Sequence, residues 1–257
     1  MQLEVMKNQM RRFGKVQMNR CFLVAIVAAV GMLLGGCLKD DNQVYQVAAV
    51  RALNAVPGSE QLDVFLNQNK LNFDNERWQD EAFAYADTLP YKNAWPDNRV
   101  VSVVDPADYP NAEPIVQQTV TFIPGKFYSL YVVGYDDIEV LYTDDDLSDP
   151  AEGKANIRFI HLSPDAPTLD FEVTTAEAEA EDPLRLDGYA FKEATDFAAV
   201  DGGVEHTIRF IEHGGEEVLH TFEFTPETGM IYTVWVKGLV NSDDDAALGF
   251  SHGIVVH

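Results

Sequence analysis

Cysteine and positive charge are both scarce in this 257-residue sequence. The two cysteines lie within the first 37 residues, so the rest of the chain holds neither a disulfide framework nor a cysteine-based zinc site. The 18 lysines and arginines stand against 42 aspartates and glutamates, which gives a net charge of −24. A protein that binds the phosphate backbone of nucleic acids needs a basic face, so this excess of acidic residues excludes nucleic acid as a partner. The 46% hydrophobic content is still enough for a buried core.

The apolar run at residues 21–34 is too short to span a bilayer as a stable anchor. It follows a segment with five basic residues and one acidic residue, and it ends in Leu-Gly-Gly-Cys at residues 34–37. This arrangement resembles the signal peptide and lipobox of bacterial lipoproteins. The resemblance implies cleavage after residue 36 and a lipid on Cys37, which would hold the chain at the outer membrane. The alternatives are an uncleaved anchor and a plain secretory signal, and Met18 is a second possible start.

Leu-Lys-Asp-Asp follows Cys37 directly. This short segment resembles the export signal that sends some Bacteroidota lipoproteins to the outer face of the outer membrane. We therefore expect a cell-envelope protein exposed at the cell surface, with residues 37–46 as an acidic tether; a merely solvated tether is the alternative. Without residues 1–36 the chain has 13 basic and 41 acidic residues, which leaves a charge near −28.

The rest of the sequence contains an internal repeat, whose offset falls from 107 to 104 residues along the chain. Such a drift is expected for two copies of one module with insertions and deletions in the loops. We predict a first module at residues 47–150 and a second at residues 151–257. The aligned segments are 50–63 with 157–170, 125–134 with 229–238 and, more weakly, 83–85 with 189–191.

Each module has the pattern of an all-β domain, because short segments rich in β-branched and aromatic residues alternate with glycine and proline. No segment keeps an amphipathic helical period, and no α/β alternation is present. The clearest hairpin pairs residues 204–210 with 218–224. Its apolar positions share a face only if an odd-length loop with a bulge joins the two arms. About seven strands per hundred residues suits an immunoglobulin-like fold. The predicted fold class is therefore all-β: two tandem immunoglobulin-like β-sandwich domains after a lipoprotein signal peptide.

Residues 155–173 carry a recognisable motif: arginine, two apolar residues, histidine, then Ser-Pro-Asp-Ala-Pro, and an apolar residue before aspartate. This motif and the segment 229–238 resemble the domain-of-unknown-function family 4397. The resemblance is weaker in the first module, where Asn54 replaces His161. It implies a β-sandwich of bacterial envelope and secreted proteins, often in tandem, with no established activity.

The two prolines of the motif make residues 163–168 a rigid turn between two strands. Arg158 and Asp170 flank this turn, so we predict that they meet or bind backbone groups, as Arg51 and Asp63 would in the first module. A catalytic or ligand role for these residues is the alternative. Asn54 of the first module, which replaces His161, can form hydrogen bonds but cannot transfer a proton, and this favours the structural role. The predicted structural clamp consists of Arg51, Asp63, Arg158, His161, Asp165 and Asp170.

Acidic loops are the other candidate chemistry. Asp144, Asp145 and Asp146 are weak candidates for calcium, which takes six to eight oxygen ligands. No acidic segment has EF-hand spacing, and a solvated charged rim is the main interpretation. The sequence predicts no cofactor and no enzyme activity, because it offers no nucleophile–base pair, paired-carboxylate pocket or metal spacing.

A long insertion in the first module carries Trp78, Tyr91 and Trp95, which could stack on sugars or attach the loop to the sandwich. Two function classes follow. The first is a non-enzymatic surface adhesion or scaffold module that acts through protein contacts. The alternative is a glycan-binding surface lipoprotein, with a polysaccharide as its partner. Exposure of Trp78 and Trp95 on one shared surface would favour glycan binding, and their burial would favour the scaffold.

Overall fold

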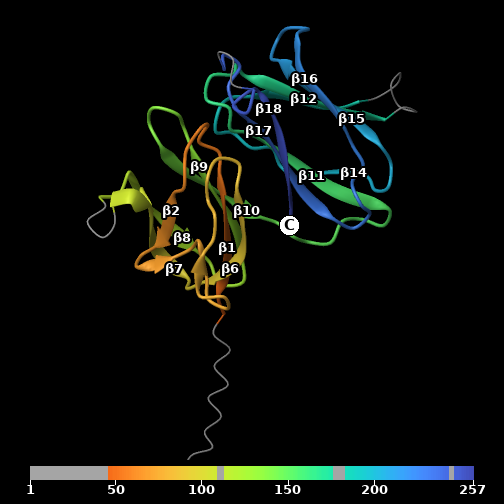
Figure 1. Cartoon of the computed structure of the whole chain (residues 1–257). Helices are drawn as coiled ribbons and strands as arrows, with labels where there is room; N and C mark the ends of the chain where they lie inside the picture. Colours follow the sequence, from red (N-terminus) through yellow and green to blue (C-terminus); the bar gives the residue numbers. More distant parts are fainter. Residues whose placement is uncertain (1–45, 109–112, 176–182, 243–245) are drawn as a thin grey trace, which may run out of the picture. The chain divides into compact units, whose positions relative to one another are not determined.

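The computed structural model describes residues 46–108, 113–175, 183–242 and 246–257 (Figure 1). Residues 46–257 form one compact unit. Its regular elements are strands apart from one short 3-10 helix at Pro106–Asp108, so the all-β prediction is confirmed. No helix within the described ranges is long and apolar enough to cross a membrane. The predicted signal peptide, Cys37 and the tether up to residue 45 lie outside the described residues.

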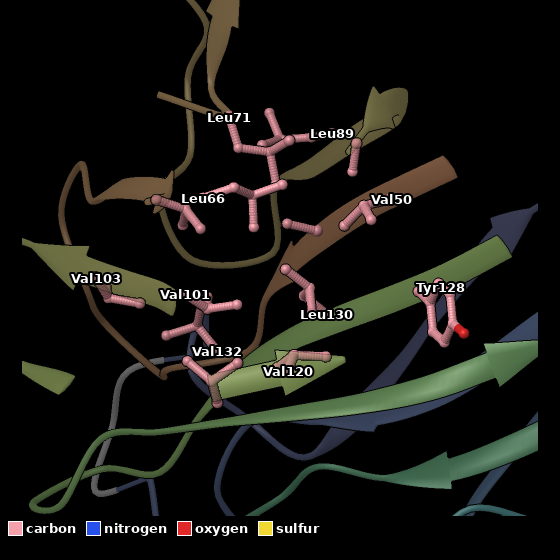
Figure 2. Close-up of a cluster of buried hydrophobic side chains, with 14 of the residues drawn as sticks. Val50, Leu66, Leu71, Leu89, Val101, Val103, Val120, Tyr128, Leu130 and Val132 are labelled. Atoms are coloured by element: carbon pink, nitrogen blue, oxygen red, sulfur yellow. The ribbon is translucent and has the colours of Figure 1, made fainter. Parts of the chain in front are cut away.

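Two four-stranded sheets make up the first half of this unit. Their orders are β10-β9-β1-β6 and β3-β2-β7-β8, and a small β4-β5 hairpin accompanies them. Apolar side chains from both sheets meet in one buried cluster, shown in Figure 2, as in a β-sandwich. The strands of this first sandwich are β1 (Ala48–Asn54), β2 (Asp63–Leu66), β3 (Asn69–Lys70), β4 (Phe73–Asp74), β5 (Gln79–Asp80), β6 (Thr88–Ala94), β7 (Asp97–Val104), β8 (Val116–Phe122), β9 (Phe127–Val133) and β10 (Glu139–Asp145).

The second half repeats this plan. Its sheets have the orders β14-β11-β17-β18 and β13-β12-β15-β16, and they enclose a second buried cluster. In both halves the two central strands of one sheet run parallel, β1 beside β9 and β11 beside β17. The strands of this second sandwich are β11 (Lys154–His161), β12 (Leu169–Thr175), β13 (Leu184–Tyr189), β14 (Ala198–Asp201), β15 (His206–Glu212), β16 (Val218–Phe224), β17 (Ile231–Lys237) and β18 (Ser251–Val256).

The strand register follows the sequence repeat residue by residue. Val50 lies beside Tyr128 in the first sandwich, and Ile157 lies beside Tyr232 in the second. The sequence repeat aligns Val50 with Ile157 at an offset of 107 residues and Tyr128 with Tyr232 at an offset of 104 residues. Equivalent residues are therefore neighbours in both sandwiches. The two sandwiches therefore share one strand plan, while the boundary between residues 150 and 151 stays a prediction.

The hairpin of β15 and β16 has the irregularity that the sequence predicts. Its register shifts between Phe210 and Ile211, so a bulge keeps the apolar positions of both arms on one face. Phe210 and Phe222 then both join the second core, with ring centroids 5.7 Å apart. The predicted bulge is confirmed.

A third buried cluster lies where the two sandwiches meet. Half of its fully buried side chains come from each sandwich, and Trp235 is the largest of them, with 2% of its surface exposed. We call this region the junction. Its buried members are Leu53, Ala55, Tyr131 and Val133 from the first sandwich and Ile160, Leu162, Trp235 and Val255 from the second.

Candidate functional site: an amide-rich pocket in the first sandwich

A pocket of about 380 Å³ opens in the first sandwich, within the range typical of small-ligand sites. It lies between the β2–β3 hairpin, β4 and the β6–β7 turn, and no aspartate or glutamate of the described chain lines it. Its lining combines five amide side chains with three cations and five apolar residues: Asn67, Gln68, Asn69, Asn75 and Asn93; Lys70, Lys92 and Arg99; Leu66, Leu71, Phe73, Ala94 and Trp95.

The β2–β3 turn forms one wall of the pocket. Asn67 has a φ of 55°, in the left-handed region that asparagine tolerates better than most residues. Its Oδ1 accepts a hydrogen bond from the amide of Val100 at 2.9 Å, and its own amide donates to the Val100 carbonyl at 2.7 Å. The tip of this hairpin is therefore fixed against β7.

The β6–β7 turn also lines the pocket and carries Trp95, of which 53% is exposed. Arg99 braces the turn, since its Nε donates to the carbonyl of Trp95 at 2.9 Å and its Nη2 to that of Pro96 at 2.7 Å. Asp97 completes the turn with a φ of 72°. Because its backbone is held in this way, the indole of Trp95 projects from a defined position.

Lys92 attaches β4 and its flanking residues to the sandwich. Its Nζ donates to the carbonyls of Leu71 at 2.8 Å and Phe73 at 3.0 Å, and it also contacts the carboxylate of Glu81. This bonding consumes the three N–H groups of the ammonium. Lys92 therefore fixes the strand that brings Phe73 to the pocket.

Trp78 lies next to the pocket on the β4–β5 hairpin. Its ring meets that of Phe73 edge to face, with centroids 5.4 Å apart, and Phe73 lines the same pocket as Trp95. Trp78 is 80% exposed and has a φ of 54°, which is strained for a bulky residue. Backbone strain of this kind clusters at functional sites.

Tyr91 does not belong to this surface, so its prediction as a glycan contact is wrong. Its hydroxyl donates to Oδ2 of Asp145 at 2.6 Å and lies 2.7 Å from Nδ1 of His257. The guanidinium of Arg51 lies over its ring, 5.0 Å from the centroid. Burial and the charge of Asp145 raise the pKa of Tyr91 well above its ordinary value. Tyr91 is a junction residue.

Arg158 and Asp170 do not meet, so that half of the clamp prediction is wrong. The other half, contacts with backbone groups, agrees with the bonds of Arg158 to the Asp144 carbonyl and of Asp170 to the Gly188 amide. Phe159 and Phe171 stack in the core with centroids 4.8 Å apart, so their neighbours Arg158 and Asp170 project from opposite faces of the sandwich. Arg158 instead pairs with Asp145, with 2.5 Å between Nη2 and Oδ1. Both arginines of the predicted clamp face the junction, because Arg51 donates to the carbonyl of Val256 at 2.8 Å.

The two aspartates of the clamp have nearby partners of their own. Asp170 accepts hydrogen bonds from Arg185 at 2.9 Å and from the Gly188 amide at 2.7 Å, and it lies 2.7 Å from Nδ1 of His213. Burial alone would raise the pKa of Asp170, but these hydrogen bonds outweigh it and lower the pKa. Asp63 of the first sandwich pairs with Lys70 at 2.7 Å, so neither aspartate meets the arginine of its turn.

His161 and Asp165 have structural positions. His161 is fully buried and donates from Nε2 to the carbonyl of Pro167 at 2.9 Å, and its pKa is lowered by burial. Asp165 accepts hydrogen bonds from the amides of Val240 at 2.8 Å and Asn241 at 2.9 Å. The motif thus ties the turn before β12 to the loop after β17.

The acidic triplet before the second sandwich does not form a calcium site in the described chain. Asp144 pairs with Lys126 at 3.0 Å, Asp145 pairs with Arg158, and Asp146 accepts from the Ser148 amide at 3.0 Å. Within the described ranges, no three histidine, cysteine, aspartate or glutamate side chains are placed to hold a metal. These calcium candidates are therefore corrected to protein contacts.

The sequence predicted Trp95 as a glycan contact, but it did not predict the amide side chains that line the same pocket. The signal was present as the consecutive Asn-Gln-Asn of residues 67–69, a polar turn between two short apolar segments. Asn93 and Arg99, which flank Trp95, could have been found by asking which side chains accompany that ring. Phe73 and Asn75 could not, because only the folding of the β4–β5 hairpin brings them to the pocket.

Comparison with protein families gives one match. Residues 48–172 match the model of DUF4397, a domain of unknown function. The DUF4397 match covers the first sandwich and the beginning of the second, so the predicted stronger resemblance of the second module is not confirmed. No curated protein matches the chain.

Several solved structures are similar in part. A family 26 carbohydrate-binding module of Eubacterium rectale Amy13K, solved with maltoheptaose, has a TM-score of 0.26 at 10% identity and covers 82% of this chain and 96% of its own. A streptococcal virulence factor described by its alpha-glucan binding has a TM-score of 0.23 at 10% identity, and the match covers 75% of this chain and 92% of that protein. A putative adhesin of Bacteroides ovatus has a TM-score of 0.21 at 10% identity, and the match covers 82% of this chain and 94% of that protein. Scores this low carry no argument about the ligand of this chain.

Proposed function

We propose that this chain is a lipoprotein on the outer face of the outer membrane that binds a glycan in the first sandwich and does no chemistry. The lipobox ending in Cys37 and the Lys-Asp-Asp that follows residue 38 support the anchor and the location. The binding role rests on one observation: the exposed Trp95 lines an amide-rich pocket together with Phe73, and the exposed Trp78 contacts Phe73.

This combination of groups suits a sugar ring. The faces of pyranose rings carry C–H groups that pack on aromatic rings, and their edges carry hydroxyls that both donate and accept hydrogen bonds. Trp95 supplies an aromatic surface, and side-chain amides such as Asn69 and Asn93 supply donors and acceptors in the same pocket. A scaffold that binds proteins has no comparable need for a polar pocket. The exposed indole of Trp95 beside the amides of this pocket therefore favours glycan binding over the scaffold role.

Binding can be tested by native electrophoresis of residues 38–257, which contain the whole compact unit, through gels that contain soluble starch, β-glucan, mannan, xylan or galactan. We expect at least one polysaccharide to retard the protein, and Trp95→Ala to abolish that retardation. Tyr135→Ala is the matched control, because Tyr135 is 54% exposed but follows the far end of β9. Equal loss in both variants, or turnover of a bound glycan, would contradict the proposal.

The location has a separate test. Cys37→Ala should abolish incorporation of labelled palmitate and release the protein from the membrane fraction, since acyl chains on Cys37 would be its anchor. Substituting the Lys-Asp-Asp of residues 39–41 with alanine should keep the lipid but remove accessibility to protease added to whole cells. An acylated alanine variant that stays accessible would refute the export role of this segment.

We also propose that the second sandwich is a second copy of the domain found in the first. The shared strand order and the matched registers of Val50 with Tyr128 and Ile157 with Tyr232 support a duplication. The equivalent hydrogen bonds from the amides of Ala86 and Lys192 to Asn54 and His161, both 2.8 Å, support it further.

A further inference from the structure

The cations of the pocket are engaged by the protein itself. Lys92 spends its donors on two carbonyls and Glu81. Lys70 lies between two carboxylates, with Nζ 2.7 Å from Asp63 and 2.8 Å from Asp80. These hydrogen bonds and charges raise the pKa of Lys70 despite its partial burial, so it stays charged and paired. Neither lysine offers an unbalanced charge to a ligand.

Arg99 is engaged in a different way. Its Nε and Nη2 donate to the carbonyls of Trp95 and Pro96, so the guanidinium acts as a brace for the turn. An arginine that selects a carboxylate presents two parallel N–H groups to it. Arg99 spends its Nε–H and one Nη2–H on these carbonyls, so the edge formed by Nε and Nη2 is engaged by the backbone, although carbonyls do not neutralise its charge.

The amides of the pocket are the groups left for a ligand. The side chains of Gln68, Asn69, Asn75 and Asn93 are exposed and make no hydrogen bond to any residue in the part of the chain that the structure describes. An amide has two donors and a carbonyl acceptor. Hydroxyl groups complement such a surface, whereas a carboxylate can only accept and would leave the amide oxygens without a partner.

The charge of the whole chain acts in the same direction. The chain without residues 1–36 has a net charge near −28, which repels a polyanion at long range. The two lysines of the pocket contact three carboxylates, Asp63, Asp80 and Glu81, which equal the three cations of the pocket in number. Taking the proposed glycan binding as its basis, we infer that the ligand of this pocket is an uncharged polysaccharide, and that these three carboxylates, together with the negative charge of the chain, select against acidic sugars.

The test compares residues 38–257 on the neutral polysaccharides named above with polygalacturonate, alginate and hyaluronan, at 50 and 500 mM NaCl. We expect retardation only by an uncharged polymer, with a Kd that changes less than twofold between the two salt concentrations. An acidic polymer that binds as strongly, and more weakly at high salt, would overturn the inference and leave glycan binding standing. Failure of every polymer would overturn glycan binding itself.

A charge variant tests the reason for this selectivity. Asp80→Asn removes one partner of Lys70 at a carboxylate that is 62% exposed, so the fold should tolerate it. We expect it to gain salt-sensitive binding to polygalacturonate, while binding to the neutral polymer stays within twofold. The matched control is Asp201→Asn, since Asp201 is 56% exposed and pairs with Lys154 in the second sandwich. If both variants gain equally or neither gains, the neutralising role of Asp80 is wrong.

Discussion

Arg158 of β11 and Asp145 of β10 form a buried ion pair across the junction, with 2.5 Å between Nη2 and Oδ1. Their side chains are 3% and 0% exposed. Ser129 donates to Asp145 at 2.7 Å, and Thr233 accepts from Arg158 at 3.0 Å. Burial alone would raise the pKa of Asp145, but the charge of Arg158 and the hydrogen bonds outweigh it and lower the pKa. The pair joins the two sandwiches at a point where water does not reach.

Breaking this pair should destabilise the protein strongly. Asp145→Asn leaves the guanidinium of Arg158 buried without its counter-charge, which costs about 3–5 kcal/mol in the free energy of unfolding. The double variant Asp145→Asn/Arg158→Met should recover part of this loss, because the uncompensated guanidinium of Arg158 is then removed. Denaturant unfolding gives the values. Asp144→Asn is the control, since its exposed pair with Lys126 is worth about 1 kcal/mol or less.

Acid should weaken the junction through His257. Burial, opposed by the charge of Asp145, lowers the pKa of His257 from 6.5 to about 4. Its folded pKa lies below its unfolded value, so the stabilisation is complete above pH 6.5 and is lost as the pH falls to about 4. The shift corresponds to about 3 kcal/mol. His252 has the same direction and a pKa of about 4, so it adds to the loss in this window.

The contribution of His257 can be separated by substitution. The free energy of unfolding of His257→Gln should fall less steeply between pH 6.5 and pH 4 than that of the wild type, because glutamine has no proton to gain. His252→Gln should reduce the slope independently. An unchanged slope in His257→Gln would show that its imidazole is not buried neutral in the folded protein.

The close approach of β18 to Trp235 gives a third prediction. A methyl group on Gly253 would overlap the indole ring of Trp235, a buried ring of the junction with little space to move. Gly253→Ala should therefore lower the free energy of unfolding by about 1–3 kcal/mol. Gly215→Ala is the control, since its nearest neighbour would be the carbonyl oxygen of Glu212 at an ordinary 3.5 Å. Melting temperatures that fall equally in both variants would refute the steric explanation.

Asp165 gives a fourth prediction, at the turn of the repeated motif. Asp165→Ala removes the acceptor for the amides of Val240 and Asn241 and for the Asn241 side chain, so we expect a loss of about 1 kcal/mol. Hydrogen exchange at residues 240 and 241 should accelerate as the loop loosens. Asp149→Ala is the control, an exposed aspartate at which the change should stay within about 0.5 kcal/mol. Unchanged exchange would contradict the role of Asp165.

Local sequence signals predicted the strands well, because each strand depends on the alternation of its own side chains. The bulge between Phe210 and Ile211 follows from apolar positions that must share a face across an odd loop. The aligned segments of the repeat likewise predict that both sandwiches contain the same pair of neighbours, Val50 with Tyr128 and Ile157 with Tyr232. Partners across the fold were harder to predict: Arg158 and Asp170 are close in sequence but project from opposite faces of the sandwich.

By itself the sequence determined the all-β class, the repeated strand plan and the presence of tryptophans in an insertion, since composition, periodicity and turns act over short distances. Only the tertiary structure decided what those residues face. It buried Tyr91 beside Asp145 and His257 in the junction, and it left Trp95 at an open pocket. The physical reason is that burial and the choice of a charged partner depend on how sheets stack, and this brings together residues as distant as Tyr91 and His257.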